Sequence, residues 1–234
     1  MQEERFRTSG IIRQLAFPFA QERVWSERVG IGTPAHEVLT EIIRFHPQIE
    51  KVSYVIYDAS NIHDYENVDD LQWIERDSLT VEKLREVPLT PAKWRQDLWE
   101  VMKDFEDFGQ YPHIWALGVG SLVQTLDGVQ AHIPMLDFCC DKAPENLTHI
   151  IELTKPYGGF ILNSGNSYHF WGSTLLSQEE YRRFLDHFAS REIFLKDLVD
   201  GNYLDMSASL NFSVLRIFAY PPQKPQEPQV VAVL

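Results

Sequence analysis

Cysteine is almost absent from this sequence of 234 residues, and its two cysteines, Cys139 and Cys140, are adjacent. An adjacent pair excludes a disulfide framework and a zinc site built on spaced thiolates. Long apolar runs are also missing, since none approaches the roughly 18 residues needed to cross a bilayer. The N-terminal MQEERFRTSG lacks the apolar segment of a secretory signal. We therefore expect a cytoplasmic protein with no membrane partner.

Positive charge is scarce as well, with 21 Lys and Arg against 34 Asp and Glu and a net charge of −13. Broad non-specific binding to nucleic acid needs a basic surface, so this balance argues against it. The negative net charge does not exclude a local basic groove, or a small anionic ligand that binds together with metal ions. The usual phosphate-binding loops and the helical zinc motif are absent from the sequence.

The first 110 residues predict an α/β segment that packs on the rest of the chain. Thr33 as N-cap and Pro34 at the first helical position predict a helix, and the β-branched and aromatic residues 51–57 predict a strand. A Thr-Pro pair at 90–91 predicts a second helix. Its aromatic stripe is more typical of core packing than of a cofactor site.

The second half of the chain, from residue 113 onward, has the pattern β-β-α-β-β-α-β. Asp127-Gly128 predicts a hairpin between strands at 113–124 and 129–138, and a helix follows at 144–154. Because hairpins dominate, we expect an α+β fold with a mainly antiparallel sheet and helices packed on one face.

The remaining signals complete the predicted domain organisation. Ser177 and Glu180 form a capping box that begins a helix, and residues 213–219 predict a last strand. The core then spans residues 111–220. It is followed by a Pro/Gln-rich tail at 221–234, which we expect to be extended and partly mobile.

Residues 158–172 (GGFILNSGNSYHFWG) predict a second hairpin, because two short apolar runs flank the turn sequence NSGN. Side chains alternate along a strand, so Ser167 and His169 share one face at a separation of about 7 Å. A hydroxyl and an imidazole side by side can hold an anion such as a phosphate. The alternative is a cross-strand polar pair on an exposed sheet face.

Acidic residues stand where the strand at 129–138 ends. Asp137 follows an apolar run, and a carboxylate there is costly to bury without a partner. Asp141 would lie about 13 Å from Asp137 along an extended strand, so the two could bind one metal only if the chain turns at Cys139-Cys140. Alternatively, Asp141 caps a turn before the next helix.

Two further charged residues follow apolar neighbours near the end of the core. Asp205 comes after Tyr203-Leu204, and Arg216 lies within the predicted last strand. Taken singly, each could simply be half of a salt bridge.

Together these segments resemble the three-motif pattern of the archaeo-eukaryotic primase superfamily, and its primase-polymerase branch in particular. The resemblance covers residues 115–224, and its middle motif is the most specific. It is carried by Leu136-Asp137-Phe138, by SGNSYHFW at 164–171, and by Leu204-Asp205 with Asn211 and Arg216. It implies an RRM-like catalytic core and a role in DNA replication or repair.

The resemblance also implies roles for individual residues. Asp137 and Asp205, and Asp141 if the chain bends, would bind Mg²⁺ or Mn²⁺, and the two motif acids would serve nucleotidyl transfer. Ser167, His169 and Arg216 would hold the phosphates of a nucleoside triphosphate. Nucleic acid is the further partner that the family implies, although the charge of −13 argues against it.

Cys139 departs from the family pattern, in which a second acid stands two residues after the first. A thiol is a poor ligand for Mg²⁺, which prefers oxygen. Three interpretations stay open. Asp141 replaces the missing acid, one metal suffices, or the protein binds nucleotides without polymerising them. The alternative function is a non-catalytic interaction or regulatory domain on a primase-like scaffold.

Overall fold

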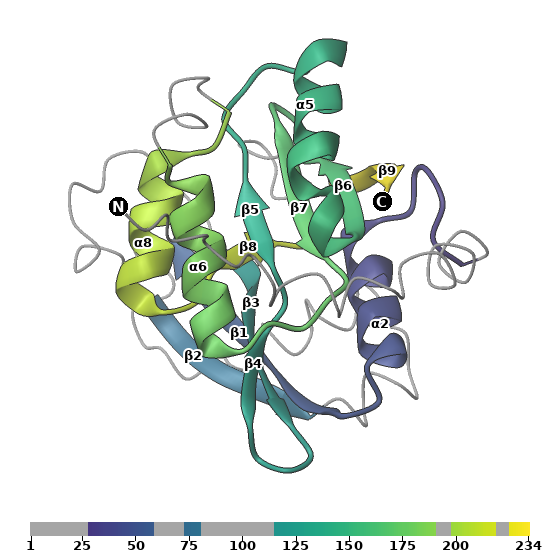
Figure 1. Cartoon of the computed structure of the whole chain (residues 1–234). Coiled ribbons are helices and arrows are strands. Elements are labelled where there is room, and N and C mark those ends of the chain that lie inside the picture. Colours follow the sequence, from purple (N-terminus) through teal and green to yellow (C-terminus); the bar gives the residue numbers. More distant parts are fainter. Residues whose placement is uncertain (1–27, 59–72, 81–114, 191–197, 219–224) are drawn as a thin grey trace, which may run out of the picture.

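Two antiparallel β-sheets lie at the centre of the structure (Figure 1). The structure is a computed structural model, and it describes residues 28–58, 73–80, 115–190, 198–218 and 225–234. The helix predicted from the Thr-Pro pair at 90–91 lies outside these residues. No helix in the described ranges is long and apolar enough to cross a membrane.

The four-stranded sheet has the order β5-β7-β6-β9, and all of its pairings are antiparallel. Its strands are β5 (Met135–Asp137), β6 (Gly159–Asn163), β7 (Tyr168–Gly172) and β9 (Gln229–Val233). β6 and β7 form the hairpin that the sequence predicts. Gly165 in its turn has a φ of 109°, a left-handed conformation that favours glycine.

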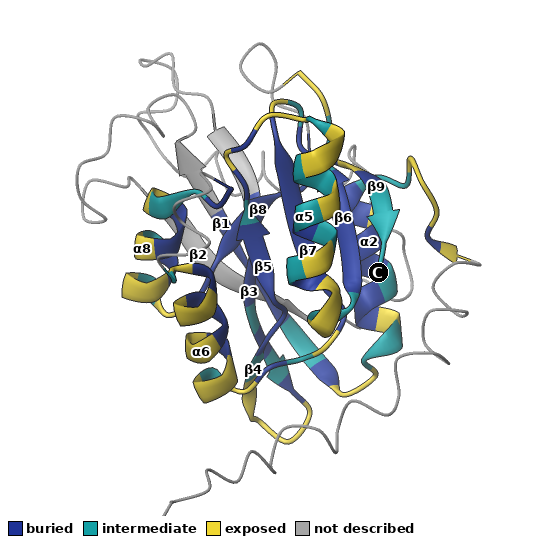
Figure 2. Ribbon diagram, turned by 45° about the horizontal axis from the view of Figure 1, so that its top comes forward, coloured by how far each residue is buried: buried dark blue, intermediate teal, exposed yellow. Residues whose placement is uncertain are grey.

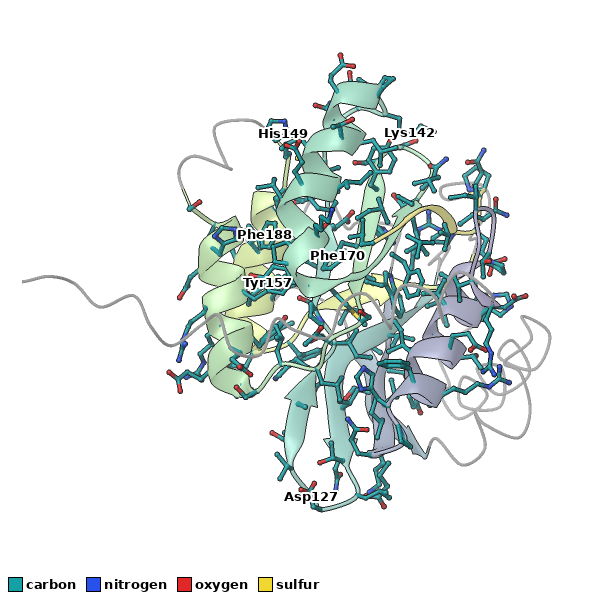
Figure 3. All side chains as sticks on the ribbon, turned by 45° about the vertical axis from the view of Figure 1, so that its right-hand side comes forward. Asp127, Lys142, His149, Tyr157, Phe170 and Phe188 are labelled. Atoms are coloured by element: carbon teal, nitrogen blue, oxygen red, sulfur yellow. The ribbon has the colours of Figure 1, made fainter. Side chains whose placement is uncertain are left out.

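The five-stranded sheet has the order β2-β1-β3-β4, with β8 pairing to β3 as well. Its strands are β1 (Ile49–Asp58), β2 (Trp73–Thr80), β3 (Trp115–Thr125), β4 (Gln130–His132) and β8 (Val214–Arg216). The turn between β3 and β4 contains Asp127-Gly128, as predicted, and Figure 3 shows Asp127 at the tip of this hairpin.

Four α-helices surround the sheets in the part of the chain that the structure describes. They are α2 (Ala35–Phe45), α5 (Pro144–Thr154, continued by the 3-10 helix η2, Lys155–Tyr157), α6 (Gln178–Phe188) and α8 (Gly201–Leu210). Their outer faces are exposed and their inner faces buried (Figure 2). The predicted capping box of Ser177 and Glu180 is confirmed at the start of α6. Helices packed on antiparallel sheets confirm the α+β class.

The four-stranded sheet is buried on both faces, because neighbouring residues of a strand point to opposite sides. Leu162 and Trp171 pack on the side of α2 and the five-stranded sheet. Phe170 points to the other side, where Tyr157 and Phe188 also lie (Figure 3). The ring centroids of Tyr157 and Phe188 are 6.2 Å apart. Because both faces are covered, a polar side chain on this sheet reaches solvent only near a strand end.

The strand expected at 129–138 is two strands in two different sheets. The chain leaves β4 of the five-stranded sheet, passes through Pro134, and enters β5 of the four-stranded sheet. Proline has no N–H to donate to a ladder, so it favours such a break. Its carbonyl still accepts a bond from the Gly172 N–H at 2.7 Å.

Three other elements differ from the sequence prediction. The N-cap of α2 is Pro34, not Thr33, whose hydroxyl instead accepts a bond from the Gly30 N–H at 3.0 Å. The sequence patterns did not predict α8. Nor did they predict β9, which lies within the residues interpreted as a tail and pairs with β6. The last part of the chain is therefore an edge strand of the four-stranded sheet.

Candidate functional site

Asp137 and His169 face each other across the pairing of β5 with β7. The Nε2 atom of His169 lies 3.5 Å from Oδ1 of Asp137. The His169 side chain is 6% exposed and that of Asp137 is 35% exposed, because Asp137 ends its strand. This pair therefore combines a nearly buried imidazole with a carboxylate that solvent can reach.

Ser167 stands directly before β7, at the end of the β6–β7 turn (residues 164–167). The Ser164 N–H donates to the Ser167 carbonyl at 3.0 Å, and the Gly165 N–H donates to Oδ1 of Asn163 at 3.0 Å. The Ser167 Oγ lies 3.9 Å from Sγ of Cys140. The turn thus fixes the backbone of Ser167 at the start of β7.

The segment that precedes α8 runs beside β5. Val199 forms an antiparallel bridge with Phe138, and the Cys139 N–H donates to the carbonyl of Leu198 at 3.0 Å. The Asp200 N–H donates to the carbonyl of Asp137 at 3.1 Å. This bond brings the backbone of a second acid, Asp200, next to Asp137.

The thiol of Cys139 lies within electrostatic reach of both carboxylates. Cys139 is exposed, but partial desolvation raises the pKa of its thiol, and the negative charges of Asp200 and Asp137 raise this pKa further. The thiol is therefore neutral at pH 7. Cys139 occupies the place of the second acid in the family pattern, next to the two carboxylates.

Asp205 is not brought to this cluster. It is exposed on α8, between the buried Leu204 and the buried Ser207. At about 100° per residue, it lies roughly 140° around the helix from Asp200. The Asp205 carboxylate makes no hydrogen bond or ion pair with any other described residue, and Asp200 is the acid whose backbone contacts β5.

Asp141 takes the turn-capping position that the sequence left open. Its Oδ1 accepts a bond from the Asn146 side-chain amide at 2.6 Å and one from the Ala143 N–H at 3.4 Å. Both donors belong to the start of α5, whose N-cap is Ala143. The carboxylate is thus engaged with its own helix start.

Arg216 is 6% exposed at the end of β8, and its guanidinium binds backbone carbonyls. Nη1 donates to Phe218 O at 2.9 Å and to Gln226 O at 2.8 Å, and Nη2 donates to Ser164 O. Ser164 belongs to the β6–β7 turn, so the predicted phosphate ligand lies under the turn that carries Ser167.

No group of three or more His, Cys, Asp or Glu side chains among the described residues is arranged to hold a metal ion by itself. Mg²⁺, however, is usually bound by one or two carboxylates together with substrate phosphates. Asp137 and Asp200 supply two carboxylates from neighbouring backbone positions, since the Asp200 N–H donates to the Asp137 carbonyl. The donor set therefore fits a metal ion that arrives with a nucleotide.

Sequence comparison identifies the fold family. The family of archaeo-eukaryotic primase 1D-like proteins matches residues 104–229, which is more than half of the chain. The chain belongs to this family. The resemblance to the primase superfamily that the motifs carry is thus confirmed. No curated protein and no solved structure matches the chain.

Asp200 is the residue of this primase-like protein that sequence reasoning missed. Leu198-Val199-Asp200 has the same apolar-apolar-acid pattern as Tyr203-Leu204-Asp205, five residues later. The pairing of Val199 with Phe138 and the bond from the Asp200 N–H to the Asp137 carbonyl distinguish Asp200 from Asp205. The family match at 104–229 covers both.

Proposed function

We propose that this primase-like protein binds a nucleoside triphosphate together with a divalent metal ion at the edge formed by β5 and β7. The observation that carries the proposal is the convergence of Asp137, His169 and Asp200, which come from three separate segments of the chain. Carboxylates beside an imidazole are the groups that a metal-bound triphosphate needs.

Asp137 and Asp200 are the proposed metal ligands. Mg²⁺ and Mn²⁺ prefer oxygen donors, and phosphate oxygens complete their coordination. Carboxylates that share one site repel each other, and a divalent cation between them relieves this repulsion. Metal and nucleotide are therefore expected to bind together more tightly than either does alone.

Ser167 and His169 are the proposed phosphate ligands. The hydroxyl and the imidazole can each donate a hydrogen bond to a phosphate oxygen. Both are more than nine-tenths buried, so their bonds to an anion would be screened little by water. The closed turn and the β5–β7 pairing hold their backbone in place, which limits the entropy lost on binding.

Nucleotidyl transfer is the catalytic extension of this proposal, with nucleic acid as the acceptor. A divalent metal ion, when bound, neutralises phosphate charge and makes an attacking hydroxyl more acidic. Cys139 stands where the family places a second acid, and a neutral thiol does not replace a carboxylate as a ligand for Mg²⁺. The missing second acid favours a second candidate function, in which the protein is a non-catalytic regulatory module that binds the nucleotide and responds to it.

Calorimetry with ATP or a dNTP in the presence of Mn²⁺ tests the binding proposal. We expect His169→Ala and Asp137→Asn to weaken binding at least tenfold. His187→Ala is the matched control, because His187 is exposed on α6. The absence of any heat of binding at millimolar nucleotide in the wild type would refute the proposal.

Primer extension with a labelled dNTP separates the two candidates. Incorporation by the wild type that Asp137→Asn abolishes would establish transfer. Nucleotide binding without incorporation, with either Mg²⁺ or Mn²⁺, would support the regulatory module instead.

A further inference from the structure

Arg216 joins the two sheets directly beneath the β6–β7 turn. Its backbone belongs to the five-stranded sheet, where it pairs with Gly118 of β3. Its Nη2 donates to the carbonyl of Ser164, which follows β6 of the four-stranded sheet. A Cβ atom on Gly165 would lie 3.9 Å from the same nitrogen, so the turn rests against the guanidinium.

The same guanidinium holds the segment that leads into β9. Nη1 donates to Gln226 O at 2.8 Å and also to Phe218 O at 2.9 Å. The neighbouring Glu227 bonds to Nδ1 of His36 on α2 at 2.5 Å, and the Ala35 N–H donates to Pro228 O at 2.9 Å. The start of β9 is therefore fixed from two sides, by Arg216 and by α2.

We propose that Arg216 is a positioning residue, which clamps the β6–β7 turn in place for Ser167 and His169 and does not itself bind the phosphates. The effect on nucleotide binding rests on the proposed function, whereas the clamp can be tested without any nucleotide. The carbonyls of Ser164, Phe218 and Gln226 are backbone groups, so these three contacts fix main-chain positions.

The chemistry of arginine explains why this position needs it. A guanidinium is planar and presents several N–H groups in a fixed fork, so one side chain can serve three carbonyls in different directions. A lysine ammonium keeps the charge but lacks this fork. Displacement of the turn by about 1 Å would move the Ser167 hydroxyl out of hydrogen-bonding reach of a phosphate placed for His169.

Amide hydrogen exchange of the nucleotide-free full chain tests the clamp. We expect Arg216→Lys to raise exchange at least tenfold in residues 164–167 and 226–230, with α2 and α5 unchanged. Arg182→Lys is the matched control, since Arg182 is exposed and bonds only to the Asn211 side chain among the described residues. Wild-type exchange in both segments of Arg216→Lys would overturn the proposal.

Nucleotide titration distinguishes clamping from phosphate contact. If Arg216 positions the turn, Arg216→Lys and Arg216→Gln weaken ATP binding by similar factors. If it contacts phosphate, Arg216→Lys keeps most of the affinity and only Arg216→Gln loses it, which would overturn the proposal. A wild type that binds no nucleotide would refute the proposed function and leave the exchange result standing.

If the Arg216 variants fail to fold, nitrogen NMR of the wild-type protein tests the clamp instead. A clamped guanidinium gives distinct, slowly exchanging Nη signals, and these shift little when Mg²⁺ and ATP are added. Fast-exchanging Nη signals in the free protein, or a large shift on adding ATP, would overturn the proposal.

Discussion

The backbone N–H of Asp200 donates to the carbonyl oxygen of Asp137 at 3.1 Å. This bond continues the bridge between Val199 and Phe138, and it places two acids from distant parts of the chain on adjacent backbone positions. Asp200 is also the N-cap of α8, where its Oδ1 accepts a bond from the Tyr203 N–H at 3.1 Å. The start of α8 and the end of β5 thus form one corner of the site.

Asp200→Asn is expected to weaken Mn²⁺-dependent ATP binding at least tenfold, whereas Asp205→Asn leaves it unchanged. Asparagine is as good an N-cap as aspartate, so the substitution removes the charge and keeps the helix start. Calorimetry gives the affinities, and the free energy of unfolding of both variants serves as the folding control. The reverse order, with Asp205→Asn the damaging change, would show that the exposed acid is the metal ligand.

Cys139→Asp is expected to strengthen ATP binding in Mg²⁺ about tenfold, or about 1.4 kcal/mol. The substitution puts an oxygen ligand next to Asp137 and Asp200, where Mg²⁺ prefers oxygen to sulfur. Cys139→Ser is the matched control, since it changes the atom and adds no charge. Equal affinities for the Asp and Ser variants in Mg²⁺ would mean that position 139 does not reach the metal.

Local sequence signals predicted the parts of the fold that depend on local chemistry. The NSGN turn and the apolar runs beside it predicted the β6–β7 hairpin, and the capping box predicted the start of α6 where the structure has it. Hairpin registers and helix caps are set by residues within a few positions, so one sequence suffices to find them.

The features that could not be predicted from the sequence depend on pairing between distant segments of the chain. The break at Pro134 depends on which sheet each half of the strand joins, and β9 depends on the open edge of β6. The choice between Asp200 and Asp205 likewise depends on the bridge from Val199 to Phe138. The family resemblance implied a phosphate-binding role for Arg216, and the carbonyls of Ser164 and Gln226 that it binds belong to remote segments that local patterns do not connect to it.

Gly159→Ala is expected to lower the free energy of unfolding by about 2–4 kcal/mol. Gly159 has a φ of 114°, and a Cβ there would stand 2.1 Å from the Trp171 carbonyl oxygen, a backbone atom that cannot turn away. Gly30→Ala is the control, since nothing lies within 4 Å of its Cβ position. Urea denaturation measures the free energy of unfolding of both variants. A decrease below about 1 kcal/mol for Gly159→Ala would contradict the predicted clash.

A buried polar network around His132 gives the fold a pH dependence. The Nε2 atom of His132 lies 2.9 Å from Gln178 Oε1, which can only accept, so Nε2 carries the hydrogen. Nδ1 lies 3.2 Å from Ser121 Oγ, which accepts from the Ser213 N–H at 2.9 Å and can donate to Nδ1. The Tyr181 ring stacks on the imidazole, with the two ring centroids 4.1 Å apart. Every contact suits neutral His132.

Burial lowers the pKa of His132 below its ordinary value of 6.5. The unfolded chain therefore takes up a proton near pH 6.5 that the folded protein does not, and stability falls as the pH drops below about 6.5 toward the lowered folded pKa. Burial of His46 lowers its pKa and adds a contribution of the same sign.

His132→Gln is expected to lower the free energy of unfolding at pH 7.5 by about 1–3 kcal/mol through lost hydrogen bonds. It should also reduce the slope of that free energy between pH 5 and 6.5 by up to about 1.4 kcal/mol per pH unit. Denaturation at several pH values measures both effects, with His187→Ala as the control because that imidazole is exposed. A slope equal to that of the wild type would show that His132 binds its proton in the folded protein as readily as in the unfolded chain.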